Sequence, residues 1–437
     1  MVSGMLIYRA IRSQVGLAAL SLRDVSIVTD ISADLCQGLV HTGWPRLIES
    51  FQNFQEDPMM SQFPRKPARV IYIAALAIAL STLSFAASGT WAPTGAMHSA
   101  RDGHTATLLA NGNLLVAGGT NNGVALASAE LYNPVAGTWA STGSMHVART
   151  LARAVLLSNG SVLVMGGCVN DCLSATTKSA ELYNPNSGTF TATGPMVQAR
   201  AEFAITLLAN GQVLVAGGCA AYDANGCSST SNKAEIYNPA TGKWTATTAL
   251  RAARHAMNAT RLASGKVLVA GGATAASDAL NSTEIYDPTA KTWTLGNKMV
   301  QARSDYASIM LGTGKILFMG GENINGVSIS NSELYNPSTG TFAATGNMTA
   351  TREEHAAVLL ANGNVLVSGG NKKTLTTQTP LASAELYNPT TGKWTATGSM
   401  SSARAGHTST VLTTGHVLNA GGSDAVNELN SAEEYTP

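Results

Sequence analysis

The C-terminal stretch 404–435 reads RAGHTSTVLTTGHVLNAGGSDAVNELNSAEEY, and its pattern decides the fold. Arg404 stands 17 residues before the pair Gly421-Gly422, and the stretch ends on Glu433 and Tyr435. The pattern recurs so that seven copies cover the chain from about Thr90 to Pro437. The arginines of the seven copies are Arg101, Arg149, Arg200, Arg254, Arg303, Arg352 and Arg404.

The spacing within the repeat is constant except at one link. Every arginine follows an aromatic residue by 10 positions and precedes a Gly-Gly pair by 17. The distance from the Gly-Gly pair to the glutamate varies from 12 to 18 residues. A unit that is constant except at one connection predicts a packed body with one loop that faces solvent.

Composition sets the outer bounds. The chain has 437 residues, of which 45% are hydrophobic and 12% are charged, so it can bury a large core. Its 43 glycines favour a turn-rich β protein. The net charge of +1, without a long run of lysine and arginine, argues against a nucleic-acid partner.

Each repeat is predicted to form four antiparallel strands. In the first repeat, residues 104–109 alternate in polarity and lead to Asn111-Gly112, a strong hairpin signal. The run 114–117 is apolar throughout, as in a strand buried on both faces. A third strand over 129–132 and a fourth that begins at Thr138-Trp139 complete one blade of a β-propeller.

The two ends of the repeat region predict ring closure. The region begins with a lone fourth-strand segment, Thr90-Trp91-Ala92-Pro93, and ends after a third strand that contains Tyr435. The first segment can therefore complete the last sheet, which leaves no open edge in the ring. We predict an all-β fold with seven blades of four antiparallel strands.

The Gly-Gly pair, the tyrosine and the tryptophan at these offsets resemble the kelch-repeat family over residues 90–437. The resemblance implies a seven-bladed kelch-type propeller, and kelch propellers include both enzymes and binding modules. We expect the repeated tyrosines and their partner Trp or Phe residues to pack between blades. We expect each arginine and glutamate to lock a blade as an ion pair or through backbone hydrogen bonds.

The segment before the propeller is unlike the repeats. Residues 1–58 lack the pattern, and we predict that translation begins at Met59 or Met60, so that 1–58 are not part of the mature protein. Residues 59–86 combine a basic segment, an apolar run and small residues before a cleavage position, which predicts a signal peptide. The alternative is a membrane anchor, if the 70–87 segment is not cleaved. We expect the mature propeller, 87–437, to be secreted, periplasmic or at the cell surface.

Four cysteines lie in the variable loops of the second and third repeats. They are Cys168, Cys172, Cys219 and Cys227. An even number in an exported chain predicts disulfides, with the pairs 168–172 and 219–227 favoured among three possible pairings. A zinc site is the alternative, although the spacings fit it poorly.

Three histidines stand three residues after an arginine, in blades that the closed ring makes neighbours. They are His355, His407 and His104, and Tyr306 occupies the same repeat position in the preceding blade. Imidazoles and a phenol that converge on the axis could hold copper or another transition metal. The alternative is packing within the fold. Our main expectation is that the protein has no cofactor.

This arrangement is similar to that of the galactose oxidase family, which has a kelch propeller and a copper–tyrosyl radical centre. That family places a tyrosine directly before a histidine and links another tyrosine to a cysteine. The present chain has no Tyr-His dipeptide, and Tyr222 lies between two cysteines that we expect to pair with each other. The resemblance therefore implies a copper oxidoreductase only as an alternative function.

Polar residues that differ between repeats are predicted on the rim where the variable loops and the arginine turns emerge. These candidates are Asp102, Glu202, His255, Asp305, Tyr306, Glu322, Glu353 and Glu354. Polar loops on a rigid ring suit a protein or carbohydrate ligand, so we predict a binding scaffold, monomeric and without a nucleic-acid partner. The alternatives are acids that only solvate the rim, and a sugar-modifying epimerase or lyase, for which kelch-fold sialic-acid epimerases are a precedent.

Overall fold

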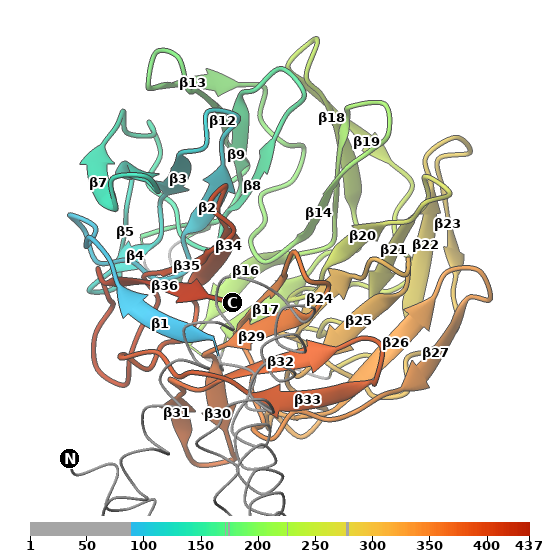
Figure 1. Cartoon of the computed structure of the whole chain (residues 1–437). Helices are drawn as coiled ribbons and strands as arrows, with labels where there is room; N and C mark the ends of the chain where they lie inside the picture. Colours follow the sequence, from blue (N-terminus) through green and yellow to red (C-terminus); the bar gives the residue numbers. More distant parts are fainter. Residues whose placement is uncertain (1–88, 171, 174, 225, 277–278) are drawn as a thin grey trace, which may run out of the picture. The chain divides into compact units, whose positions relative to one another are not determined.

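The computed structural model describes residues 89–170, 172–173, 175–224, 226–276 and 279–437. The predicted upstream segment, 1–58, and the predicted signal peptide or anchor, 59–86, lie outside these residues, so both remain predictions. The described residues are all strand and turn, without a helix, and therefore contain no helix that could cross a membrane. Figure 1 shows the sheets arranged in a ring, with β1 in blue beside β36 in red.

Seven sheets of four antiparallel strands form the blades, and their innermost strands surround a common axis. Blades 1 to 3 are β2(Thr105–Leu108), β3(Leu114–Ala117), β6(Ala129–Asn133) and β7(Thr138–Ser141); β8(Arg153–Leu156), β9(Val162–Met165), β12(Ala180–Asn184) and β13(Thr189–Thr193); and β14(Ala204–Leu207), β15(Val213–Ala216), β18(Ala234–Asn238) and β19(Lys243–Thr247). Blade 4 is β20(Ala259–Arg261), β21(Val267–Ala270), β22(Thr283–Asp287) and β23(Thr292–Leu295).

Blades 5 to 7 repeat this order. They are β24(Ala307–Met310), β25(Ile316–Met319), β26(Ser332–Asn336) and β27(Thr341–Ala344); β28(Ala356–Leu359), β29(Val365–Ser368), β32(Ala384–Asn388) and β33(Lys393–Ala396); and β34(Thr408–Val411), β35(Val417–Ala420), β36(Ala432–Thr436) and β1(Thr90–Pro93). The predicted seven-bladed propeller is confirmed.

The ring closes as predicted. Strand β1 pairs with β36, so that Trp91 lies opposite Tyr435 and Ala92 opposite Glu434. The first and last strands of the propeller therefore belong to one sheet, in which β36 is paired on both sides and β1 takes the place of the outermost strand.

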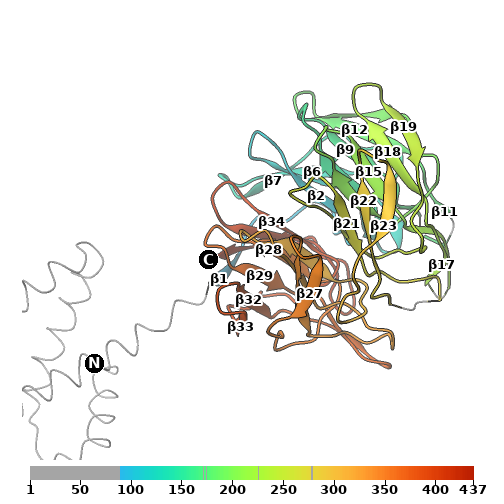
Figure 2. The same cartoon turned by 90° about the vertical axis from the view of Figure 1, so that its right-hand side faces the viewer.

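Four variable loops form short hairpins of their own. These hairpins are β4(Thr120–Asn121) with β5(Val124–Ala125), β10(Cys168–Val169) with β11(Ala175–Thr176), β16(Cys219–Asp223) with β17(Gly226–Thr230), and β30(Asn371–Lys373) with β31(Gln378–Pro380). Both predicted disulfides are present, Cys168–Cys172 and Cys219–Cys227. Figure 2 shows β11 and β17 close together, and Thr176 Oγ1 donates a hydrogen bond to the Ala220 carbonyl at 2.7 Å.

The core lies between adjacent blades rather than within them. The second strand of every blade is buried at all four positions, as the continuous apolar runs predicted. The ring of Tyr132 packs on Trp139 at 5.0 Å between centroids, and its hydroxyl lies 2.7 Å from Thr94 Oγ1 of the preceding blade. This confirms that the repeated tyrosines join neighbouring blades.

Each blade is locked by one buried arginine. Arg101 is fully buried, and its guanidinium donates to Glu130 Oε1 at 2.8 Å and to the Gly118 carbonyl at 2.6 Å. The same ion pair occurs in all seven blades, with N–O distances from 2.6 to 3.1 Å. Gly118 has φ +72°, and a Cβ there would lie 2.5 Å from the Arg149 carbonyl oxygen, so this close approach between blades requires glycine.

Candidate functional site

The second residue after each arginine adopts a left-handed backbone conformation and lies at the axis. Its φ ranges from +49° to +62°. The seven residues are Gly103, Leu151, Glu202, Ala256, Asp305, Glu354 and Gly406. Five of them are not glycine, and each L residue held in this region costs about 1–2 kcal/mol. Because Leu151 and Ala256 share the conformation with the three acids, it belongs to the fold as a whole.

A closed circle of backbone hydrogen bonds explains how this conformation is maintained. The amide of each of the seven residues donates to the carbonyl of its counterpart in the preceding blade, with N–O distances from 3.0 to 3.5 Å. The circle closes where the Gly103 amide donates to the Gly406 carbonyl. We call these seven residues the axial ring. The repeat spacing thus brings Glu202, Asp305 and Glu354 to one place, although they are far apart in the sequence.

The residue before each ring position pairs with the start of the variable loop. Isolated bridges join Asp102 to Thr120, His255 to Ala273 and Glu353 to Asn371, with counterparts in the other blades. The variable loops and the arginine turns therefore emerge on one rim, as the sequence predicted. We call this surface the axial rim: it comprises the axial ring, the residues that precede it and the variable loops.

Carboxylates from blades 5 and 6 meet on the axial rim. Lys373, from the β30–β31 hairpin, donates to Glu322 at 2.7 Å and lies 4.0 Å from Glu353. Asn371 donates to Glu354 at 2.9 Å. The Glu353 side chain is only 3% exposed. The Glu354 side chain is more exposed to solvent, although many protein atoms lie around it. Lys373 is thus the cation nearest to both Glu322 and Glu353, and Glu354 lies close to this pair.

A second group lies across the ring. Tyr222 donates its hydroxyl proton to Glu202 at 2.9 Å, and His255 Nε2 lies 3.9 Å from the same carboxylate. Arg153 donates to the Phe203 carbonyl at 3.1 Å, and its charge interacts with Glu202, Tyr222 and Asp305. This side of the rim therefore combines the Arg153 cation with the Glu202 carboxylate, and His255 lies nearby.

Several carboxyls of the axial rim have a pKa above that of an ordinary carboxyl. Burial raises the pKa of Glu353 to about 9, helped by its hydrogen bond with the Glu322 carboxyl. Burial raises the pKa of Glu354 to about 7, with the charges of Asp102 and Glu202 adding to the effect. Burial also raises the pKa of Asp305 well above its ordinary value, and the neighbouring glutamate charges raise it further. These carboxyls therefore tend to hold their protons near neutral pH, and a cation bound beside them would favour the ionised form.

Asp102 completes the acidic set in blade 1. Its carboxylate accepts hydrogen bonds from the Gly103 amide at 2.6 Å and from Ser423 Oγ at 3.2 Å. Burial raises the pKa of this carboxyl. The structure therefore places seven of the eight predicted rim residues on the axial rim: Asp102, Glu202, His255, Asp305, Glu322, Glu353 and Glu354.

Tyr306 is the exception and corrects the prediction. Its side chain is buried at 6% exposure, and its hydroxyl donates to the Ala270 carbonyl at 2.5 Å. The ring packs on Phe318 with centroids 5.6 Å apart. Tyr306 therefore fills the interface between blades 4 and 5 and is not available to a ligand.

The three histidines share this packing position, so the predicted metal set is also corrected. His104, His355 and His407 are each less than 9% exposed, and each imidazole lies over the first glycine of the Gly-Gly pair of the preceding blade. Within the described ranges, no three His, Cys, Asp or Glu side chains are grouped so that they could hold a metal ion. The donor set does not fit copper, because each imidazole is enclosed in a different blade interface.

Arg153 and Lys373 were not predicted from the sequence to lie on the axial rim. Arg153 stands four residues after its repeat arginine, where the other six repeats have Thr, Ala or Asn, so comparison at that offset could have found it. Lys373 lies in a loop of variable length, where no repeat position exists for comparison.

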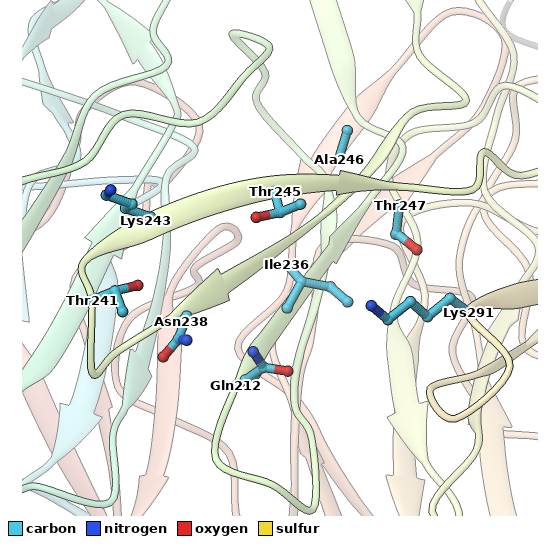
Figure 3. Close-up of a pocket in the computed structure, with 9 residues that line it drawn as sticks. All are labelled: Gln212, Ile236, Asn238, Thr241, Lys243, Thr245, Ala246, Thr247 and Lys291. Atoms are coloured by element: carbon cyan, nitrogen blue, oxygen red, sulfur yellow. The ribbon is translucent and has the colours of Figure 1, made fainter.

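A separate pocket of about 240 Å³ lies beside β18 and β19 of blade 3. Figure 3 shows Ile236 at its centre, with Lys243 and Lys291 at opposite ends. None of its lining residues belongs to the axial rim. Its wall consists of repeated strand and turn positions, so it provides a comparison surface for binding experiments.

Comparison with known proteins supports the fold. Four stretches match the Kelch motif: residues 104–146, 207–249, 262–300 and 355–401. The chain is therefore a β-propeller that contains Kelch motifs. A search of curated proteins found no match.

Among solved structures, the chain is similar to a fungal alcohol oxidase of the AA5 family in complex with copper. The TM-score is 0.63 and the identity is 20%, over 80% of this chain and 76% of that chain. A likeness at this identity concerns the fold alone.

Proposed function

We propose that this propeller is a non-enzymatic recognition module that binds its ligand on the axial rim. The observation that carries the proposal is the axial ring, which joins all seven blades and brings Glu202, Asp305 and Glu354 into one circle. A rigid scaffold with polar side chains at one end of its axis suits recognition. Protein binding is common among kelch propellers, and the polar side chains of this rim suit either a protein or a carbohydrate ligand.

The protein is proposed to act after export. The neighbouring variable loops of blades 2 and 3 each contain one disulfide. Such bonds persist in oxidising compartments. Secretion, a periplasmic location or attachment at the cell surface would all provide that environment.

The oxidase alternative has less support. The fungal neighbour binds copper, but the three predicted histidines of the present chain are distributed over separate blade interfaces. Tyr222 contacts a glutamate, and the cysteines on either side of it form a disulfide with each other. No copper-dependent step is therefore derived for this chain.

Thermal shift with a panel of ligands tests the proposal, because a ligand that binds the folded state raises the melting temperature. The panel contains a basic peptide, an acidic peptide, neutral oligosaccharides and Cu(II). We expect one of the organic ligands to raise the melting temperature, and Glu202→Gln with Glu354→Gln to abolish the effect. Asp287→Asn is the control, because five other repeats already have asparagine at that turn.

Two results would contradict the proposal. One is a ligand whose effect survives the rim variants but is lost on replacing Lys243 and Lys291 in the comparison pocket. The other is peroxide release from galactose or simple alcohols in the presence of copper, which would favour the oxidase alternative.

A further inference from the structure

Large apolar side chains gather at the tips of the variable loops. Nine large hydrophobic residues are exposed in the described structure, and five of them lie on these loops. The five come from blades 1, 2, 5, 6 and 7: Val124, Leu173, Ile324, Leu375 and Val426. Their exposed fractions run from 55% to 84%. Single exposed aliphatic residues are ordinary, but one per loop around the same rim is a pattern that interaction surfaces show.

The loops that carry these side chains are held in place. Leu173 lies next to the Cys168–Cys172 disulfide. The hairpin that carries Leu375 is anchored to blade 5, because the Ser328 amide donates to the Lys373 carbonyl at 3.0 Å and Lys373 Nζ donates to Glu322. Binding to prearranged loops loses little conformational entropy, so their apolar side chains can contribute to affinity.

The carboxyls inside this circle of loop tips on the axial rim determine which charge a partner should have. Seven carboxyls of the axial rim interact with one another: Asp102, Glu202, Asp305, Glu322, Glu353, Glu354 and Glu428. Arg153, Lys373 and the nearby His255 are the cationic or ionisable basic groups that interact with them in the described residues. Lys373 lies 2.7 Å from Glu322 and 4.0 Å from Glu353, whose buried carboxyl holds its proton at neutral pH. A partner that adds positive charge at this point is electrostatically complementary.

We propose that the axial rim binds a protein segment that presents a lysine or arginine flanked by aliphatic side chains. The basic group occupies the acidic centre, and the flanking side chains cover the exposed tips of the variable loops. This inference rests on the proposed recognition function and names its partner class. A neutral oligosaccharide would match the hydrogen-bonding groups but would leave the cluster of carboxyls without a further cation and the five aliphatic tips uncovered.

The test measures fluorescence anisotropy of three labelled probes with the full chain at low salt. The probes are a short peptide with one lysine between leucines, the same peptide with glutamate for lysine, and the same peptide with serine for leucine. We expect the first probe to bind at least about tenfold more tightly than either of the others, which corresponds to about 1.4 kcal/mol per change. Its affinity should fall as salt is raised, because salt screens the charges.

Matched variants locate the binding. Replacing Glu202→Gln, Asp305→Asn and Glu354→Gln together should weaken the lysine probe about tenfold or more, whereas Asp287→Asn should leave it unchanged. Leu375→Ser with Val426→Ser should weaken it by a similar factor, whereas Val135→Ser, at an exposed β6–β7 turn, should not. Circular dichroism checks that every variant is folded.

The outcomes separate this inference from the proposed function. Failure of the lysine probe to bind, or equal affinity for the lysine and glutamate probes, overturns the partner class. If a neutral oligosaccharide then binds and the acid variants abolish its binding, the recognition function stands and only the partner class is wrong. If the lysine probe binds equally to the triple acid variant and to Asp287→Asn, both are overturned.

Discussion

The indole of Trp91, near the start of the propeller, packs against the phenol of Tyr435, near its end, with ring centroids 5.1 Å apart. An equivalent pair of a tyrosine with a tryptophan or phenylalanine occurs in every other blade, for example Tyr132 and Trp139 at 5.0 Å. The seam is therefore built like every other blade, although its strands come from opposite ends of the repeat region. This relationship makes the closure of the ring testable.

A disulfide across the seam should stabilise the protein more than the same disulfide within a blade. Thr90 and Thr436 are paired at the seam, and Thr138 and Asn133 are paired equivalently in blade 1. By loop-closure entropy, cysteines at the first pair should add about 6 kcal/mol and cysteines at the second about 2 kcal/mol. Thermal melting of each variant, oxidised and reduced, measures the difference after the change in the wild type is subtracted. Equal effects would contradict closure through β1.

Arg303→Ala should strongly destabilise the fold. Arg303 is fully buried and donates to Glu333 at 2.9 Å and to the Gly320 carbonyl at 2.7 Å. Removing it leaves a buried carboxylate without its cation, which costs about 3–5 kcal/mol. Chemical denaturation measures the loss, with the exposed Arg251→Ala as the control. If the two variants are equally stable, the arginines do not lock the blades.

Glu353→Gln should change the pH dependence of stability. The pKa of Glu353 is raised to about 9, so its contribution to stability is present below the ordinary carboxyl pKa and is lost as pH rises toward 9. The glutamine variant should therefore gain stability relative to the wild type between pH 5 and about 9. Melting temperatures across this range provide the measurement.

Glu385 should affect the pH dependence of stability in the opposite direction. Its pKa is lowered, because hydrogen bonds from the Thr349 amide and Arg352 outweigh burial. Glu385→Gln should therefore be destabilising at neutral pH, and the difference from the wild type should shrink as pH falls below the ordinary carboxyl pKa. If Glu353→Gln and Glu385→Gln showed the same pH trend, the assignment of the two carboxyls would be wrong.

His355→Met should stabilise the protein in mild acid and should not alter its response to metals. Neither ring nitrogen of His355 has a hydrogen-bond partner in the described structure, and burial lowers its pKa to about 3. Unfolding lets the imidazole take up a proton, so the wild type loses stability as pH falls from about 6.5 toward 3. Methionine occupies the equivalent position at Met257 and cannot take up that proton. A rise in melting temperature with Cu(II) that the variant lacks would revive the metal-site hypothesis.

Cation binding at the axial rim should release protons. The pKa of Glu354 is raised to about 7, and the titratable groups that interact with it include Asp102, Glu202, Asp305, Glu353 and Lys373. A bound cation favours the ionised carboxylate, so the affinity for the lysine peptide should rise from pH 5.5 to about 8. Calorimetry in two buffers of different ionisation enthalpy measures the released protons. In Glu354→Gln this release should be smaller.

The constant spacing of the repeat was sufficient to predict the blades and their order. The apolar run 114–117 and the lone segment at Trp91 led directly to the buried second strand and to the seam. The disulfides also followed from the sequence, because each cysteine pair lies within one loop. These features depend on local pattern and on repetition, which can be recognised from the sequence alone.

The site was only partly predictable. The offsets showed that Glu202, Asp305 and Glu354 occupy equivalent places, but not that a backbone circle brings them together at the axis. Tyr306 and the histidines were misassigned because position after the arginine does not show whether a side chain turns toward the rim or into the blade interface. Lys373 depends on the path of a variable loop, which repetition does not determine.

Hydrogen exchange with and without the lysine peptide tests the central claim most directly, because it shows where the ligand binds. We expect slower exchange in the segments that contain Glu202, Asp305 and Glu354 and in the loops that carry Ile324 and Leu375. Exchange around Lys243 and Lys291, at the comparison pocket, should not change. Protection confined to that pocket, or no protection on the axial rim, would contradict the account.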